Sequence, residues 1–152
     1  MGATTLKFLH TFHTTKWHHT QDPCPLCKEI PQSIYHTILE CEITKKAWNE
    51  LEITLYRIYE IPVSNEEKAV GIFEERPTEG LLLRNLLTFV LRQAISDSER
   101  ECYYKSRDSL NVIKRTFRKI LQEVVFQATL RGSNRNKGDF INKVLTHKVG
   151  QG

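Results

Sequence analysis

The sequence predicts an all-α fold in which a small zinc knuckle of the CCHC type (three cysteines and one histidine) is followed by a helical bundle. Three observations support this fold class. Cys24, Cys27, His36 and Cys41 have the spacing C-x2-C-x8-H-x4-C, apolar residues recur downstream at three- and four-residue steps, and no segment shows the period-two alternation of a half-buried strand. The 152 residues, of which 39% are hydrophobic, are enough to build one such core.

The Cys/His cluster combines donor types that Zn²⁺ prefers. Cys24 and Cys27 flank a tight Pro-Leu turn that aims two thiolates at one point. His36 and Cys41, on or just after a short helix that Ser33 caps, complete a tetrahedron. Four protein ligands leave no position for water, so we expect a structural rather than a catalytic metal. Because reduced metal-binding cysteines are typical of intracellular compartments, we expect the nucleus or the cytoplasm.

Other interpretations of these residues stay open at this point. The cysteines could instead be buried thiols or form disulfides. His18 or His19, just upstream, could replace His36 as a zinc ligand. Cys102 lies outside the cluster, and we expect it to be a lone buried thiol.

Two helices are predicted around the cluster. An aromatic-rich helix precedes it within residues 1–20 and ends before Pro23. An amphipathic helix follows it from residue 43 to residue 59, with Trp48 as its anchor, and stops near Pro62. We assign residues 1–61 to a CCHC zinc-binding lobe with flanking helices, and residues 62–152 to a helical C-terminal region with a basic face.

Three helices are predicted in the C-terminal region. Ser64 and Glu67 form a capping-box pattern, which indicates a short helix to about Gly71. A long helix begins at about residue 79 and carries an apolar stripe that includes Leu82; charged residues interrupt its apolar run, so we expect a core helix rather than a membrane span. The cleanest apolar stripe predicts a last helix over 110–128, before Gly132.

Charge is distributed unevenly along the chain. Residues 1–102 contain 11 Lys/Arg and 15 Asp/Glu, whereas residues 103–152 contain 11 Lys/Arg and 3 Asp/Glu. Four basic residues share one arc of the last predicted helix, and three follow in a Gly/Ser/Asn-rich segment: Lys114, Arg115, Arg118, Lys119, Arg131, Arg135 and Lys137. Such a surface suits a phosphate backbone and predicts binding to RNA or DNA, although a solvated helix face is the simpler alternative.

Common catalytic motifs are missing from the sequence. It contains no Gly-rich phosphate loop, no G-x-S-x-G nucleophile motif and no carboxylate pair of the kind a polymerase uses. A zinc deaminase needs a Glu two residues after its His ligand, whereas Ile38 stands two residues after His36. We therefore expect a binding module rather than an enzyme, with no small-molecule substrate and no membrane insertion.

The cluster and its surroundings resemble a known zinc-binding segment. Asp22-Pro-Cys-Pro-Leu-Cys27, then Tyr35-His-Thr-Ile-Leu-Glu-Cys41, then Trp48, resemble the segment downstream of the polymerase in LINE-type (non-LTR) retrotransposon reverse transcriptases. The resemblance implies an all-α zinc module that contacts template RNA or target DNA during target-primed reverse transcription. Polymerase motifs are missing here, so we expect either the C-terminal part of such a protein or a stand-alone protein derived from one.

Two function classes follow. The first is a non-catalytic, zinc-dependent nucleic-acid-binding module. The alternative is a zinc-stabilised protein-interaction adaptor, in which residues 40–79, with 10 Asp/Glu against 5 Lys/Arg, contact a polymerase core or another partner.

Overall fold

The computed structural model describes residues 22–104 and 108–130. These residues form a π-helical turn and four α-helices: η2 (His36–Glu40), α2 (Glu42–Tyr59), α3 (Asn65–Val70), α4 (Glu79–Tyr104) and α5 (Ser109–Leu130). Within the described ranges the only β structure is one isolated antiparallel bridge, between Pro23 and Pro31. The predicted all-α fold with a knuckle before the helices is confirmed. The predicted helix within residues 1–20 lies outside the described residues.

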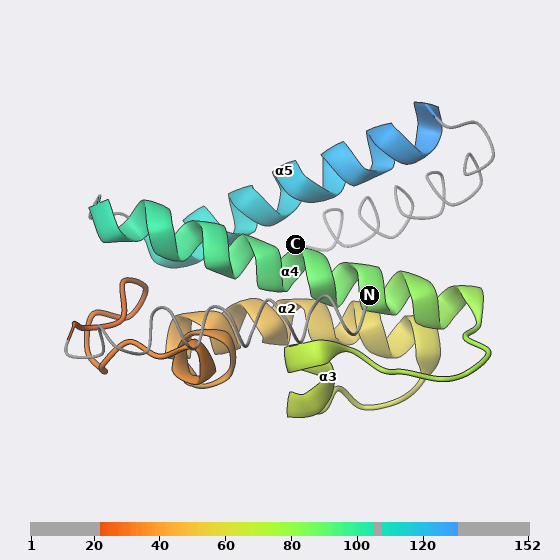
Figure 1. Ribbon diagram of the computed structural model, residues 1–152, viewed down its shortest axis with the longest axis horizontal. Coiled ribbons are helices and arrows are strands. Elements are labelled where there is room, and N and C mark those ends of the chain that lie inside the picture. Colours follow the sequence, from red (N-terminus) through yellow and green to blue (C-terminus); the bar gives the residue numbers. More distant parts are fainter. Residues whose placement is uncertain (1–21, 105–107, 131–152) are drawn as a thin grey trace.

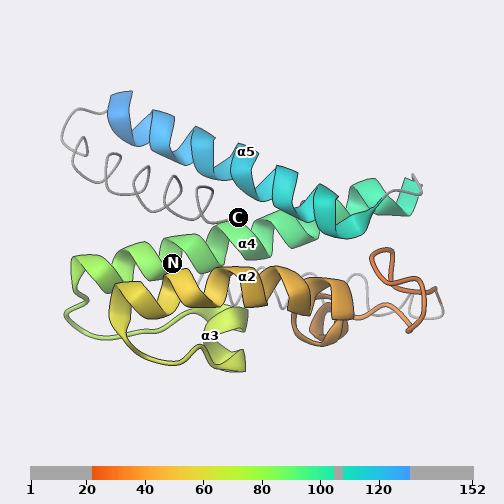
Figure 2. The same cartoon turned by 180° about the vertical axis from the view of Figure 1, so that it is seen from behind.

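The long helices form two neighbouring layers. Helices α2 and α4 lie side by side, and α5 packs against α4 and diverges from it toward its own C-terminal end (Figures 1 and 2). Helix α3 lies on the opposite side of α4 from α5 in both views. The segment 22–41, which we call the knuckle, lies at the end of the molecule where α4 ends and α5 begins.

One buried apolar cluster connects the knuckle with the helices. It includes Cys24 and Leu26 of the knuckle, Trp48 of α2, Leu87 of α4 and Ile113 of α5. Trp48 is fully buried and acts as the predicted anchor of its helix, and Cys102 is a buried free thiol as predicted. The buried residues come from both sides of residue 61, where the sequence predicts a boundary between two parts of the chain. That boundary stays a prediction.

Helix α4 carries polar residues on a buried face. Leu82, which was predicted to belong to the apolar stripe, is 41% exposed, and this part of the prediction is wrong. Arg84 and Thr88 are fully buried instead, because this face of α4 packs against α3 and the segments that flank it. Among the described helices none is both long enough and apolar enough to cross a lipid bilayer.

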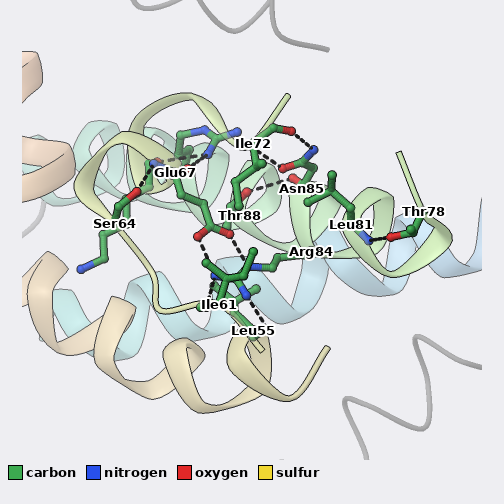
Figure 3. A network of polar contacts seen from close by, with 12 residues as sticks. Leu55, Ile61, Ser64, Glu67, Ile72, Thr78, Leu81, Arg84, Asn85 and Thr88 are labelled. Atoms are coloured by element: carbon green, nitrogen blue, oxygen red, sulfur yellow. Dashed lines mark hydrogen bonds and ion pairs between the residues drawn. The ribbon is translucent and has the colours of Figure 1, made fainter. Parts of the chain in front are cut away.

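Arg84 organises a polar network between α2, α3 and α4 (Figure 3). Its guanidinium donates to both carboxylate oxygens of Glu67, and the Nη2–Oε2 distance is 2.7 Å. It also donates to the carbonyl oxygens of Leu55 at 3.0 Å and Ile61 at 2.6 Å. Ser64 Oγ accepts from the Glu67 N–H at 3.1 Å, so the predicted cap of α3 is present. The Glu67 carboxylate, however, pairs with Arg84. In a complete capping box it would instead accept a hydrogen bond from the Ser64 N–H.

The end of α3 is also tied to α4. The Asn85 side chain accepts from the N–H of Ile72 at 2.9 Å and donates to its carbonyl at 2.8 Å. The preceding Gly71 has φ +91°, and a Cβ there would lie 2.9 Å from Asn85 Oδ1, so only glycine fits this close approach. Arg92 donates to the carbonyl of Lys68 at 3.0 Å, and burial lowers the pKa of Arg92 to about 10.

Candidate metal centre and basic face

The first half of the knuckle is a tight turn that presents Cys24 and Cys27. The Cys24 N–H donates to the carbonyl of Ile30 at 2.7 Å, and the Lys28 N–H donates to the carbonyl of Cys24 at 2.8 Å. Lys28 has φ +65°, a left-handed conformation that reverses the chain directly after the second cysteine. The backbone, rather than side-chain packing alone, therefore directs both thiols to the same side of the turn.

The second half places His36 and Cys41. Ser33 Oγ accepts from the His36 N–H at 3.0 Å, which confirms the predicted cap. The Cys41 N–H donates to the carbonyl of His36 at 2.6 Å, and this five-residue closure is the wide turn of a π-helix. Trp48 Nε1 donates to the carbonyl of Ile38 at 2.9 Å, so the turn is fixed on α2. Two ligands that are five residues apart are thereby brought together.

The four side chains lie close enough together to hold one metal ion. Their ligand atoms all lie within 4.8 Å of one another, and Cys27 Sγ lies 3.4 Å from His36 Nε2. Zinc bond lengths give a tetrahedron with a sulfur–nitrogen edge of about 3.6 Å and sulfur–sulfur edges of about 3.8 Å. Cys24 and Cys41 are fully buried and His36 is 3% exposed. The donor set and its size therefore fit Zn²⁺.

The sulfurs of Cys24 and Cys41 shift each other's pKa in opposite directions. The hydrogen bond between the Cys24 and Cys41 sulfurs lowers the pKa of Cys41 to about 5, and burial opposes this shift. The same hydrogen bond raises the pKa of Cys24, because the pair holds one proton between two sulfurs. Backbone N–H groups in the first turn of α2 also lower the pKa of Cys41. A divalent cation in this cluster would take the place of the shared proton.

Of the alternative interpretations of the cluster, the disulfide is excluded in this structure, and the exchange of a histidine ligand stays open. All four cysteines of the chain are free, so no disulfide forms in the structure. His36 Nε2 faces Cys27, while His36 Nδ1 is buried without a hydrogen-bond partner among the described residues. His18 and His19 lie outside the described residues, and their exchange with His36 stays an open alternative.

Polar contacts fix the knuckle on the end of the helical hairpin formed by α4 and α5. Lys28 Nζ donates to the carbonyl of Cys102 at 3.0 Å, in the last turn of α4. Ser109 Oγ, at the start of α5, donates to the carbonyl of Leu26 at 2.9 Å. The Gln32 side chain adds a contact with the carboxylate of Glu99. The metal cluster is therefore coupled to the position where α5 begins.

The four basic residues predicted on α5 lie along one groove. Lys114, Arg115, Arg118 and Lys119 line a groove of about 390 Å³ together with Asn111 and Gln122. The charge pattern alone did not identify Asn111 and Gln122, although the count of 100° per residue places them on the same arc of α5 as the cations. Arg131, Arg135 and Lys137 lie outside the described residues.

Two of these cations are paired within the chain. Lys114 Nζ lies 2.7 Å from a carboxylate oxygen of Glu50 on α2, and Arg115 Nη2 lies 2.7 Å from one of Glu101 on α4. Arg118 and Lys119 are exposed, and neither forms an ion pair with another described residue. The groove therefore holds two paired and two unpaired cations within the described part of the chain.

Comparison of the chain with known protein families, with curated proteins and with solved structures finds no match. The functional interpretation therefore depends on two features of the chain itself. These are the four-ligand Cys/His cluster and the basic groove of α5.

Proposed function

We propose that the chain is a non-catalytic, zinc-dependent nucleic-acid-binding module. The observation that carries the proposal is the groove of α5, which gathers four cationic side chains and two amide side chains. None of the described residues that line it is acidic. Phosphate oxygens accept hydrogen bonds from both kinds of donor, and cations supply the salt-dependent part of the affinity.

Zinc has a structural role in this proposal. Cys24, Cys27, His36 and Cys41 would fill its coordination sphere and leave no position for a reacting water. The resemblance of this segment to the zinc-binding segment of LINE-type reverse transcriptases supports the same function, with template RNA or target DNA as the partner. The fixed knuckle would hold the start of α5, and hence its groove, through Ser109.

A protein-interaction adaptor is the second candidate, and a separate observation favours it. Within the acidic stretch 40–79, Ile53, Tyr56 and Phe73 are 63%, 51% and 56% exposed. Exposed aromatic and aliphatic side chains supply the buried centre of protein–protein interfaces. Ile53 and Tyr56 are three residues apart on α2, so they share one face of that helix.

Reversing Arg118 and Lys119, the two cations of the groove that form no ion pair with a described residue, tests the proposed function. We expect Arg118→Glu/Lys119→Glu to weaken binding to RNA and DNA at least about tenfold. It should also lower the log–log salt slope by about 1.4 to 1.8, because each lost phosphate contact removes about 0.7 to 0.9. Fluorescence anisotropy with labelled oligonucleotides at several salt concentrations measures both quantities.

Arg57→Glu/Arg76→Glu is the matched control for this variant. It makes the same change in net charge at two exposed positions outside the groove, so it should keep most of the affinity. Equal weakening in both variants would indicate that overall charge, not the groove, determines binding. Unchanged affinity of a folded Arg118→Glu/Lys119→Glu variant would favour the adaptor.

The intramolecular ion pairs lead to a gain-of-affinity prediction. Glu50 and Glu101 compete with phosphates for Lys114 and Arg115, and exposed pairs of this kind contribute about 0–1 kcal/mol each. We expect Glu50→Gln/Glu101→Gln to bind about two- to tenfold more tightly at low salt, and the gain to shrink as salt screens the charges. Anisotropy titrations at low and high salt measure this; no gain at low salt would show that Lys114 and Arg115 do not contact phosphate.

A further inference from the structure

Phe126 is an exposed aromatic side chain on the basic helix. It is 57% exposed, whereas its neighbour Val125 and Leu121, one turn earlier, are buried. The apolar face of α5 therefore does not include Phe126. A large exposed ring on an otherwise polar face of a helix is a candidate contact for a ligand.

The position of Phe126 continues the groove. Arg115, Lys119, Gln122 and Phe126 follow one another at steps of four, three and four residues, which places them in one row along α5. Phe126 lies about 6 Å further along the helix axis than Gln122, at 1.5 Å per residue. The row begins with cations and amides and ends with an aromatic ring.

From this row we infer that α5 binds single-stranded nucleic acid, with the groove holding phosphates and Phe126 stacking on an unpaired base. The inference rests on the proposed function and specifies its substrate class. A phenyl ring has no hydrogen-bonding group with which to contact base edges, but it stacks on the face of any base. In a duplex the neighbouring base pairs cover these faces, whereas a single strand exposes them.

The length of the groove together with Phe126 fits a short stretch of one strand. From Asn111 to Phe126 the helix spans about 22 Å along its axis, at 1.5 Å per residue. Single-strand binding folds occupy about 4 nucleotides or more per site, and they too combine a cationic track with stacking aromatic side chains. Charge alone would hold single and double strands alike, so the ring is the feature that discriminates between them.

Phe126→Ala, measured on single strands and on a duplex, tests the inference. The probes are a labelled oligothymidylate, a labelled oligouridylate and a labelled DNA duplex. We expect a loss of about 5- to 150-fold on the single strands, the range that alanine substitution of a stacking residue gives, and an unchanged affinity for the duplex. Comparison of the thymidylate and uridylate strands shows whether DNA or RNA is preferred.

Two further variants sharpen the test. Phe126→Trp keeps a stacking ring and should retain single-strand binding. Tyr56→Ala removes an exposed ring of α2, outside the groove, and should leave the affinity for all three probes unchanged. Thermal unfolding should confirm that all three variants are folded, since each changes an exposed side chain.

The outcomes separate this inference from the proposed function. If Arg118→Glu/Lys119→Glu weakens binding but Phe126→Ala does not, the groove binds nucleic acid and the stacking role is wrong. An equal loss on single strands and duplex after Phe126→Ala also overturns it. If neither variant weakens binding to any of the probes, both the inference and the proposed function fail.

Discussion

Replacing Cys41 by Ser is expected to abolish zinc binding and to unfold the knuckle. Cys41 is fully buried and supplies one of four ligand atoms, so a serine hydroxyl there would leave three ligands. Structural zinc sites contribute on the order of 10 kcal/mol or more of binding free energy at neutral pH, and this free energy is also folding free energy. Elemental analysis should find about one zinc per wild-type chain and almost none in the variant.

Cys102→Ser is the matched control, because Cys102 is also a buried free thiol but lies outside the cluster. This variant should keep its zinc. Hydrogen exchange after chelation should show loss of protection in residues 22–41 before the central turns of α4 and α5, which have their own apolar contacts. Full zinc content in Cys41→Ser, or none in freshly purified wild-type protein, would contradict the assignment of the metal site.

Arg84→Leu is expected to destabilise the fold by about 3–5 kcal/mol, the usual cost of removing one partner of a buried ion pair. The Glu67 carboxylate would remain buried without its counter-ion. The carbonyls of Leu55 and Ile61 would each lose a hydrogen bond from the guanidinium, which adds to the cost. Urea unfolding followed by circular dichroism measures the change in the free energy of unfolding.

The double variant Arg84→Leu/Glu67→Leu distinguishes the cost of leaving one buried charge unpaired from the cost of altered side-chain packing. It removes both charges together, so it should recover part of the stability that Arg84→Leu loses. Arg57→Leu changes an exposed arginine and should shift stability by less than about 0.5 kcal/mol. A loss of stability in Arg84→Leu no larger than that of Arg57→Leu would show that the buried pair does not hold α3 against α4.

The sequence was sufficient for the features that depend on residues close together in the chain. The four residues of the candidate metal cluster all lie within residues 24–41, so their spacing alone identifies the cluster. The caps at Ser33 and Ser64 each involve an N–H three residues later, and such local patterns predict helix starts well. Trp48 could be identified as an anchor because it lies on the apolar stripe of its own helix.

Features that depend on distant partners could not be predicted in this way. Glu67 matched a capping box, but its carboxylate pairs with Arg84, whose burial depends on where α4 packs. Leu82 fits the apolar stripe by its spacing, yet it is exposed, whereas polar residues of α4 such as Arg84 and Thr88 are buried beside its leucines. The charge pattern of α5 did not show that Lys114 and Arg115 are paired, because their partners belong to other helices.

The contacts of the knuckle with Cys102 and Ser109 have a consequence for the order of folding. All four residues of the candidate metal cluster are present once residue 41 has been synthesised, so metal capture there would require only a short loop closure. The contact from Leu26 to Ser109 spans 83 residues, and long-range contacts of this kind form slowly. During synthesis on the ribosome, the candidate metal cluster can therefore assemble before α5 has emerged and before Ser109 has bonded to the carbonyl of Leu26.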